Sequence, residues 1–210
     1  MQLFEPPPQQ EILKDVYLLQ GFVLPNESQL LADLATVIEK APLRNMVTPG
    51  GLPMSVHSAS CGALGWVSDR KGYRYSPVDP MNNKPWPKMP QSFRLMASAA
   101  AAISGFTNFE PDACLINRYS IGAKMGLHQD KDEQDFTQPI VSVSLGVSAV
   151  FQMGGLKRSD KVLKFALHHG DVLVWGGESR LRFHGVMPVK ASHHPGLGNV
   201  RINLTFRKAG

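Results

Sequence analysis

The stretch VRINLTFR, residues 200–207, alternates between apolar and polar side chains. Side chains of a β-strand point alternately to opposite faces, so the four polar residues are expected on one face of a sheet. These residues are Arg201, Asn203, Thr205 and Arg207. An ordinary half-exposed strand with its polar face in water would show this pattern, and so would a strand lining a polar pocket inside a β-barrel.

A second polar strand face is predicted upstream, in residues 113–119, and it changes the balance between these two explanations. Leu115, Asn117 and Tyr119 share one face there. His128 and Asp130 follow, two residues apart, so a locally extended chain would point both side chains the same way. Because unpaired polar groups are costly to bury, two polar faces in a small β-structure predict a ligand pocket.

His128 and Asp130 could hold one side of a metal ion, with His184 as the third ligand. His184 follows the predicted strand 171–175 and its Gly-Gly turn. Two histidines and one carboxylate, with positions left open, are typical of non-haem Fe(II) oxygenases, although zinc hydrolases can use the same set. The His-x-Asp spacing alone is common by chance, so the ligand set does not choose the metal.

Arg201 favours the oxygenase. An oxygenase that uses 2-oxoglutarate needs a cation deep in the barrel for the carboxylate far from the metal, and a planar guanidinium binds a carboxylate at two points. Asn117 and Tyr119 could complete the hydrogen bonding from the neighbouring strand. A zinc hydrolase has no evident need for this cluster.

The rest of the chain predicts a mostly β protein with flanking helices. Helices are expected over residues 26–40 and 91–104, after an extended arm formed by the first ten residues. Strands are expected over 113–119, 140–153, 163–167, 171–175 and 200–206, which favours an antiparallel sandwich or barrel. Residues 48–90 contain only short strand candidates and are expected to form a functional loop region.

Composition limits the class of protein. The chain has 210 residues, enough for one domain with a substantial core, and its hydrophobic content of 43% excludes a disordered chain. Two cysteines without CxxC spacing predict a reducing compartment. Neither a membrane-spanning run nor a signal peptide is recognisable, so a cytoplasmic protein is expected. The net charge of +5 permits a polyanionic partner without requiring one.

Motifs along most of the chain resemble one family. NRYSIGAKMGLHQD at 117–130, His184 and RINLTFR at 201–207 are similar to motifs of the AlkB family of nucleic-acid dealkylating dioxygenases. The resemblance also covers MVTPGG at 46–51, YSP at 75–77, NKPWP at 83–87, MPQSF at 89–93 and WGGESR at 175–180. It therefore spans nearly the whole chain after residue 40, and it is greatest to the bacterial AlkB subgroup.

The resemblance implies a double-stranded β-helix (jelly-roll) core with an N-terminal nucleotide-recognition lid. Both would lie in a single domain, 1–210, with the extension and lid in residues 1–110 and the catalytic core in 111–210. It implies an Fe(II)- and 2-oxoglutarate-dependent dioxygenase that uses O2, with iron on His128, Asp130 and His184. The implied 2-oxoglutarate contacts are Asn117, Tyr119, Arg201, Asn203 and Arg207. Arg201 would bind the distal carboxylate, with Arg207 nearer the metal.

The implied reaction is DNA repair by demethylation of N1-methyladenine and N3-methylcytosine, in single- or double-stranded DNA, with RNA left open as a second substrate. The implied base contacts are Trp66, Tyr73, Tyr75, Asp132 and Arg158. Trp66 and His128 would lie on opposite faces of a flipped base, and Asp132 would favour the cationic methylated bases by charge. A monomer is expected.

Plainer explanations exist for several of these residues. Trp66 and Tyr73 could pack under a long loop, and Asp132 could belong to a solvated charge run. For its neighbours Lys131 and Glu133, the solvated run is the preferred interpretation. Six basic residues could form a phosphate-binding rim or only a solubilising surface. They are Arg70, Lys71, Arg74, Lys157, Arg158 and Lys161.

Two lid segments depart from the family pattern, at Leu52 and at residues 55–60, and could shift substrate or strand preference. Two other functions stay open. One is a 2-oxoglutarate oxygenase acting on a protein or small molecule, against which the lid aromatics and Asp132 argue. The other is a module that binds alkylated strands without turnover, against which the complete metal triad and both arginines argue.

Overall fold

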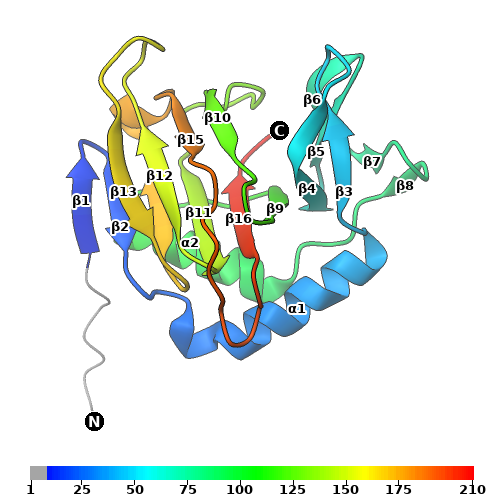
Figure 1. Ribbon diagram of the computed structural model, residues 1–210, viewed down its shortest axis with the longest axis horizontal. Coiled ribbons are helices and arrows are strands. Elements are labelled where there is room, and N and C mark those ends of the chain that lie inside the picture. Colours follow the sequence, from blue (N-terminus) through cyan, green and yellow to red (C-terminus); the bar gives the residue numbers. More distant parts are fainter. Residues whose placement is uncertain (1–8) are drawn as a thin grey trace.

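The computed structural model describes residues 9–210, and its largest element is an eight-stranded antiparallel sheet (Figure 1). The predicted arm at residues 1–8 lies outside the described residues, and residues 9 and 10 already belong to the first strand. The sheet runs in the order β1 (Gln9–Leu13), β2 (Val16–Leu19), β14 (Val172–Trp175), β11 (Ile140–Gly146), β16 (Arg201–Arg207), β9 (Ala113–Tyr119), β4 (Pro53–Gly62) and β3 (Arg44–Val47).

A four-stranded antiparallel sheet packs against one face of the larger sheet. Its order is β10 (Met125–His128), β15 (His184–Val186), β12 (Ala149–Met153) and β13 (Leu163–Leu167). Phe151 and Met153 of β12 share a buried cluster with Trp175 of β14 and Tyr119 of β9. The predicted fold class, a mostly β protein with a jelly-roll core and flanking helices, is confirmed.

Both predicted helices are confirmed, and they cover the outer face of the large sheet (Figure 1). They are α1 (Glu27–Lys40) and α2 (Gln91–Ile103). Leu34 of α1 and Phe93 of α2 are buried in one cluster with Leu204 and Phe206 of β16. The apolar face of β16 is thus turned toward the helices, which leaves its polar face turned toward the smaller sheet.

The single strand predicted over residues 140–153 is wrong, because this segment forms two strands, β11 and β12, in different sheets. The chain turns at Gly146, whose φ is +84°. A Cβ atom at this position would lie 2.2 Å from the Val200 carbonyl oxygen, so the turn requires glycine.

The front half of the chain contributes more strand than the sequence predicts. The ten-residue strand β4 lies inside the expected loop region and pairs with β9 in the large sheet. Short hairpins follow, β5 (Gly65–Asp69) with β6 (Gly72–Ser76) and β7 (Val78–Asp79) with β8 (Lys84–Pro85). Small residues such as Ser58, Ala59 and Ser60 are buried in β4 without an alternating pattern, which explains why it was missed.

Candidate metal centre and co-substrate cavity

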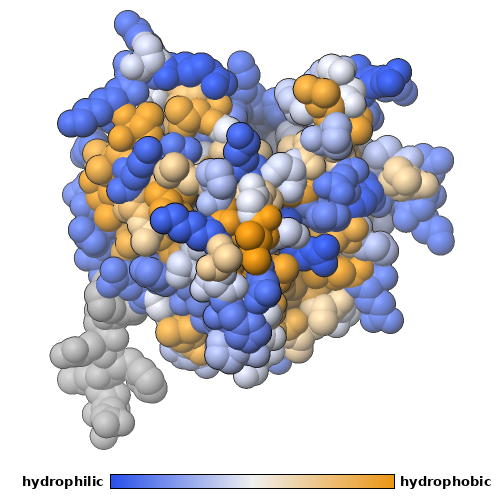
Figure 2. Space-filling model, viewed as in Figure 1, coloured by the Kyte–Doolittle hydropathy of each residue, from blue (hydrophilic) through white to orange (hydrophobic). Residues whose placement is uncertain are grey.

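A cavity of about 460 Å³ opens between the eight-stranded sheet, the four-stranded sheet and the β5–β6 hairpin. We call this hairpin the lid hairpin. Figure 2 shows the molecular surface hollowed between the lobe that carries β12 and β13 and the lobe that carries β5 and β6. Twelve of the thirteen predicted site residues line this cavity: Trp66, Tyr73, Tyr75, Asn117, Tyr119, His128, Asp130, Asp132, Arg158, His184, Asn203 and Arg207. The thirteenth, Arg201, lies on the same face of β16 as Asn203.

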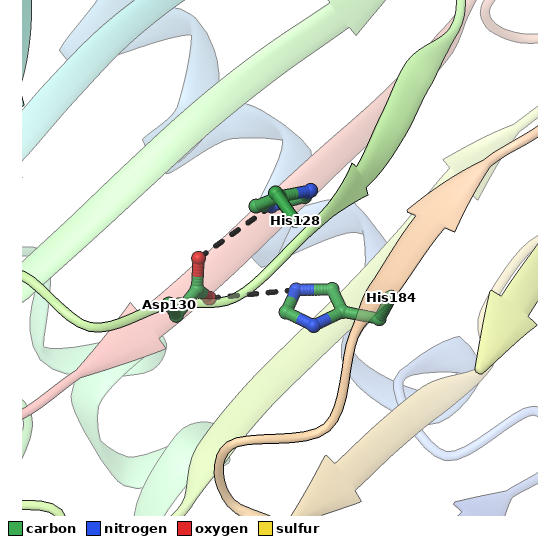
Figure 3. Close-up of side chains that lie close together, drawn as sticks. All are labelled: His128, Asp130 and His184. Atoms are coloured by element: carbon green, nitrogen blue, oxygen red, sulfur yellow. Dashed lines mark ion pairs between the residues drawn. The ribbon is translucent and has the colours of Figure 1, made fainter. Parts of the chain in front are cut away.

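His128, Asp130 and His184 all line the cavity, and their side chains lie close together (Figure 3). His128 ends β10 and His184 begins β15, and these two residues are paired across the small sheet. Each offers one ligand atom, and the three atoms lie within 4.8 Å of one another. The predicted triad is therefore assembled in space, with one histidine brought in from 54 residues downstream by strand pairing.

Backbone hydrogen bonds select the tautomer of both histidines. Nδ1 of His128 lies 2.9 Å from the Gly126 carbonyl oxygen, and Nδ1 of His184 lies 3.0 Å from the Arg182 carbonyl oxygen. Because a carbonyl only accepts, both Nδ1 atoms carry a proton, and in the neutral form of each ring the free lone pair is therefore on Nε2. Both Nε2 atoms face Asp130, at 3.5 Å and 3.6 Å from its carboxylate oxygens. Metal ligation requires this arrangement.

The charges around the triad favour the ligating forms. Partial burial and the neighbouring His184 lower the pKa of His128 to about 4, so its imidazole is neutral at pH 7. Burial alone would raise the pKa of Asp130, but the Arg207 guanidinium holds it well below its usual range. The Nε atom of Arg207 donates to Asp130 Oδ2 at 3.0 Å. Two imidazoles and one carboxylate suit a divalent cation such as Fe(II).

Arg201 is a buried cation with unsatisfied donors. Its side chain is 1% exposed, and its Nη2 atom donates to Ser144 at 2.9 Å. Its Nε and Nη1 atoms have no hydrogen-bond partner among the described residues. Burial lowers the pKa of this guanidinium, which lies 5.0 Å from the centre of the Tyr119 ring, and no carboxylate within residues 9–210 forms an ion pair with it. A buried arginine with two free donors fits the carboxylate of a dianion such as 2-oxoglutarate.

Two asparagines face each other across β9 and β16, with different hydrogen bonding. Asn203 donates to Ser142 at 2.8 Å and to the Val143 carbonyl at 2.9 Å, and its Oδ1 accepts from Thr205 at 2.8 Å. Both of its amide hydrogens are therefore used within the protein. Asn117 accepts from the Ser58 hydroxyl at 2.6 Å. Ser58 and Thr205 were not singled out as site residues, and Ser58 carries no motif that could have marked it.

The lid hairpin supplies the aromatic wall at the mouth of the cavity. Trp66 and Tyr73 are stacked, with ring centroids 5.6 Å apart and planes at 14°. The Trp66 indole donates to Asp132 at 2.9 Å, and Asp132 is exposed. On the opposite rim, the Arg158 guanidinium lies 5.2 Å above the Phe183 ring. These side chains are placed by one or two contacts each.

Glu133 is buried, so its prediction as part of a solvated charge run is wrong. It is 6% exposed, and its carboxylate lies 3.1 Å from Arg180 and 3.3 Å from Arg207. It also accepts a hydrogen bond from the Tyr75 hydroxyl at 2.8 Å, and burial raises the pKa of Tyr75, so this phenol stays protonated. The side chain turns inward because the guanidinium groups of Arg180 and Arg207 pair with its carboxylate there. Lys131 is exposed, in line with its prediction.

The six basic residues of the predicted rim differ in their contacts. Arg74 forms a double hydrogen bond with Asp69 within the lid hairpin, so its charge is already paired. Arg70, Lys71, Lys157, Arg158 and Lys161 are exposed. Of these five, only Arg158 lines the cavity, and exposed cations of this kind would attract a polyanion.

The fold and the site together define an Fe(II)- and 2-oxoglutarate-dependent oxygenase, and comparison with known proteins supports this class. The model of the 2OG-Fe(II) oxygenase superfamily matches residues 15–207. A solved structure, "The structure of OsALKBH1", superposes with a TM-score of 0.79 at 30% identity and covers 96% of this chain and 100% of that one.

Full-length relatives narrow the class. The chain is 54% identical over 204 residues to the alpha-ketoglutarate-dependent dioxygenase AlkB of Escherichia coli (strain K12), covering 97% of this chain and 94% of that protein. It is 42% identical to the AlkB homolog of Caulobacter vibrioides (strain NA1000 / CB15N), covering 95% and 93%. The chain belongs to the AlkB family, in its bacterial subgroup. Among residues 9–210, no helix has the length and apolar character needed to cross a membrane.

Proposed function

We propose that this enzyme repairs DNA by oxidative demethylation of N1-methyladenine and N3-methylcytosine. Fe(II), 2-oxoglutarate and O2 would be consumed as cofactor and co-substrates, and formaldehyde, succinate and CO2 would be released. One observation carries the proposal. The metal triad lines a cavity that also carries the aromatic side chains of the lid hairpin and the Asp132 carboxylate, and a buried arginine with free donors, Arg201, shares the face of β16 that lines this cavity.

His128, Asp130 and His184 would hold the iron through two Nε2 atoms and one carboxylate oxygen. When bound, iron with 2-oxoglutarate and O2 supplies the oxidation of the N-methyl carbon, after which the hydroxymethyl group leaves as formaldehyde. The protein holds the ligands in place through the carbonyls of Gly126 and Arg182, which fix both imidazole rings.

Arg201 would bind the distal carboxylate of 2-oxoglutarate with its two free donors. Asn117 and Tyr119 face the same cavity from β9 and would donate to the co-substrate. Arg207 already donates to Asp130, so its proposed role is at the metal end. Asn203 would contribute through its place beside the co-substrate, because its amide hydrogens are used inside the protein.

Trp66 would stack on the flipped base, with His128 on the other face. Tyr73 supports the outer side of the indole. The Asp132 carboxylate beside this slot would favour a cationic methylated base over the neutral repaired one. Tyr75 and Arg158 would complete the contacts at the rim. Base–aromatic stacking contributes roughly 1–3 kcal/mol per base, which suits a slot that must release its product.

The name of one human relative, nucleic acid dioxygenase ALKBH1, supports a nucleic-acid substrate; the chain is 35% identical to it over 97 residues. We further propose that DNA is the main substrate, with RNA as a second one, and that the protein acts as a cytoplasmic monomer. It would fold as one domain, in which residues 1–110 form the extension and lid and 111–210 the catalytic core.

The test is mass spectrometry of a single-stranded oligonucleotide that carries one N1-methyladenine. It is incubated with protein, Fe(II), ascorbate, 2-oxoglutarate and air, beside a His184→Ala control. Loss of one methyl group, only with the unaltered protein and only with 2-oxoglutarate, is expected. Succinate formation with an unchanged oligonucleotide would instead assign the oxygenase to another substrate. No succinate despite bound iron would favour a binding module.

A further inference from the structure

Ser58 is a buried polar residue of β4 that touches a proposed co-substrate contact. It is the Cα partner of Asn117 on β9, and the two side chains are 1% and 5% exposed. The Ser58 hydroxyl donates to Asn117 Oδ1 at 2.6 Å. Because an amide has its oxygen on one side and its NH2 on the other, this bond turns the NH2 group away from β4.

The Asn117 NH2 group is left free for the cavity. Within residues 9–210 it makes no hydrogen bond, and it is not among the buried nitrogen atoms that lack a partner. Asn117 lines the cavity, so its NH2 group reaches that space. Asn203, directly opposite on β16, has both amide hydrogens used by Ser142 and Val143. Of this facing pair, Asn117 is the one that presents a donor.

We propose that Ser58 is a positioning residue for 2-oxoglutarate, whose hydroxyl fixes the Asn117 amide so that its NH2 group donates to an oxygen of the co-substrate. This inference rests on the proposed function, in which Asn117 contacts 2-oxoglutarate. The reversed amide would present a lone pair to an anion that offers only oxygen acceptors. Fixing the amide in advance avoids that repulsive arrangement.

The same strand supplies a matched control. Ser60 lies two residues further along β4, on the same face, opposite Leu115. It is fully buried, as Ser58 nearly is, but its hydroxyl has no hydrogen-bond partner in the described part of the chain. Ser60→Ala therefore removes the same atom from the same strand without releasing an asparagine amide.

The experiment measures 2-oxoglutarate binding without turnover. Isothermal titration with protein loaded with Mn(II) in place of iron gives the dissociation constant for Ser58→Ala, Ser60→Ala, Asn117→Ala and the double variant. Ser58→Ala is expected to weaken binding by about 3- to 10-fold, the usual value of one neutral hydrogen bond. Ser60→Ala is expected to bind as the unaltered protein does. The double variant should bind no more weakly than Asn117→Ala alone.

A spectroscopic measurement on the unaltered protein covers the case of a variant that misfolds. The side-chain NH2 resonances of Asn117 should be sharp before 2-oxoglutarate is added and should shift on its addition. In Ser58→Ala they should broaden or move before any addition. Thermal unfolding of each variant checks that the fold is retained.

The outcomes separate this inference from the function beneath it. If Asn117→Ala weakens binding and Ser58→Ala does not, the positioning role is wrong and the function stands. If Ser58→Ala has the same cost in the double variant, Ser58 acts through another group and the inference is overturned. If Asn117→Ala leaves binding unchanged, the assignment of Asn117 to the co-substrate fails first.

Discussion

The two ends of the cavity are built differently. At the metal end, backbone carbonyls hold the rings of His128 at the end of β10 and of His184 on β15, and Arg207 of β16 holds the Asp130 carboxylate. At the lid end, Trp66 and Tyr73 stand on a two-stranded sheet, and Tyr73 is 49% exposed. The metal end is prepared before any ligand arrives, while the lid end can adjust to a polymer that enters from solvent.

Two carboxylates only two residues apart show the same contrast. The side chain of Asp130 is 11% exposed and faces two imidazoles and the Arg207 guanidinium. Asp132 is exposed and accepts one hydrogen bond, from Trp66. Glu133 lies next to Asp132, turns inward and connects the two ends, from Tyr75 of the lid hairpin to Arg207 beside Asp130. Neighbours in sequence thus serve opposite ends of the cavity.

The largest effect is expected when the metal end loses a ligand. His184→Ala should lower activity by more than about 100-fold, because even the outer contacts of a metal ligand contribute about 10- to 100-fold. Metal analysis of the purified protein should show reduced iron, while oligonucleotide binding at the lid end changes little. Normal iron content in this variant would contradict the ligand assignment.

Breaking the connection between the two ends should cost stability. Glu133→Gln leaves Arg180 without its buried counter-charge, and we expect about 3 kcal/mol of lost stability, as for a broken buried pair. Urea unfolding of the variant measures it. Lys131→Gln, an exposed neighbour, is the control and should unfold like the unaltered protein. Equal midpoints for the two variants would show that Glu133 is not held as described.

A substitution at Arg201 tests whether 2-oxoglutarate binding depends on the planar guanidinium group or only on its positive charge. Arg201→Lys keeps the charge and loses the two free donors, so 2-oxoglutarate affinity should fall by about 1.5–3 kcal/mol, the value of a hydrogen bond to a charged group. Titration calorimetry with Mn(II)-loaded protein measures this loss. An unchanged affinity would place the distal carboxylate elsewhere.

At the lid end, Trp66→Ala should weaken binding of a methylated oligonucleotide by roughly 1–3 kcal/mol, the contribution of one stacked base. Fluorescence anisotropy with a labelled strand measures it. Co-substrate binding should stay as in the unaltered protein, because Trp66 lies on the lid hairpin. If both ligands weakened together, the two ends would not be separate.

The smallest effect is expected within the lid hairpin itself. The side-chain hydrogen bond from Arg74 lowers the pKa of Asp69 to about 2. The pair therefore adds stability above pH 4, and this contribution is lost as the pH falls through 2. Because the two side chains are partly exposed, 37% for Arg74 and 35% for Asp69, solvent screens the pair and Asp69→Asn should change thermal stability only slightly. An NMR titration of the Asp69 carboxyl group checks the direction.

Some parts of this protein were predictable because their signal is local. The alternation in 200–207 places a polar face on β16, and helical spacing marks α1 and α2. Strand β4 was not predicted because its buried residues are small and do not alternate with exposed ones. The break between β11 and β12 after Gly146 was not predicted, because two apolar strands joined by a short turn read in the sequence as one apolar run.

The sequence by itself determined the mostly β class through the local periodicity of its strands. Its spaced motifs determined the family, and with it the jelly-roll core and the metal triad that this resemblance implies. Only the tertiary structure decided which charges are buried and which amides are free. Glu133 turns inward because Arg180 and Arg207 lie there, and Asn117 presents its NH2 group because Ser58 is paired opposite it. Such partners come from segments more than 45 residues apart in the sequence, and the cost of burying a polar group depends on whether that partner is present.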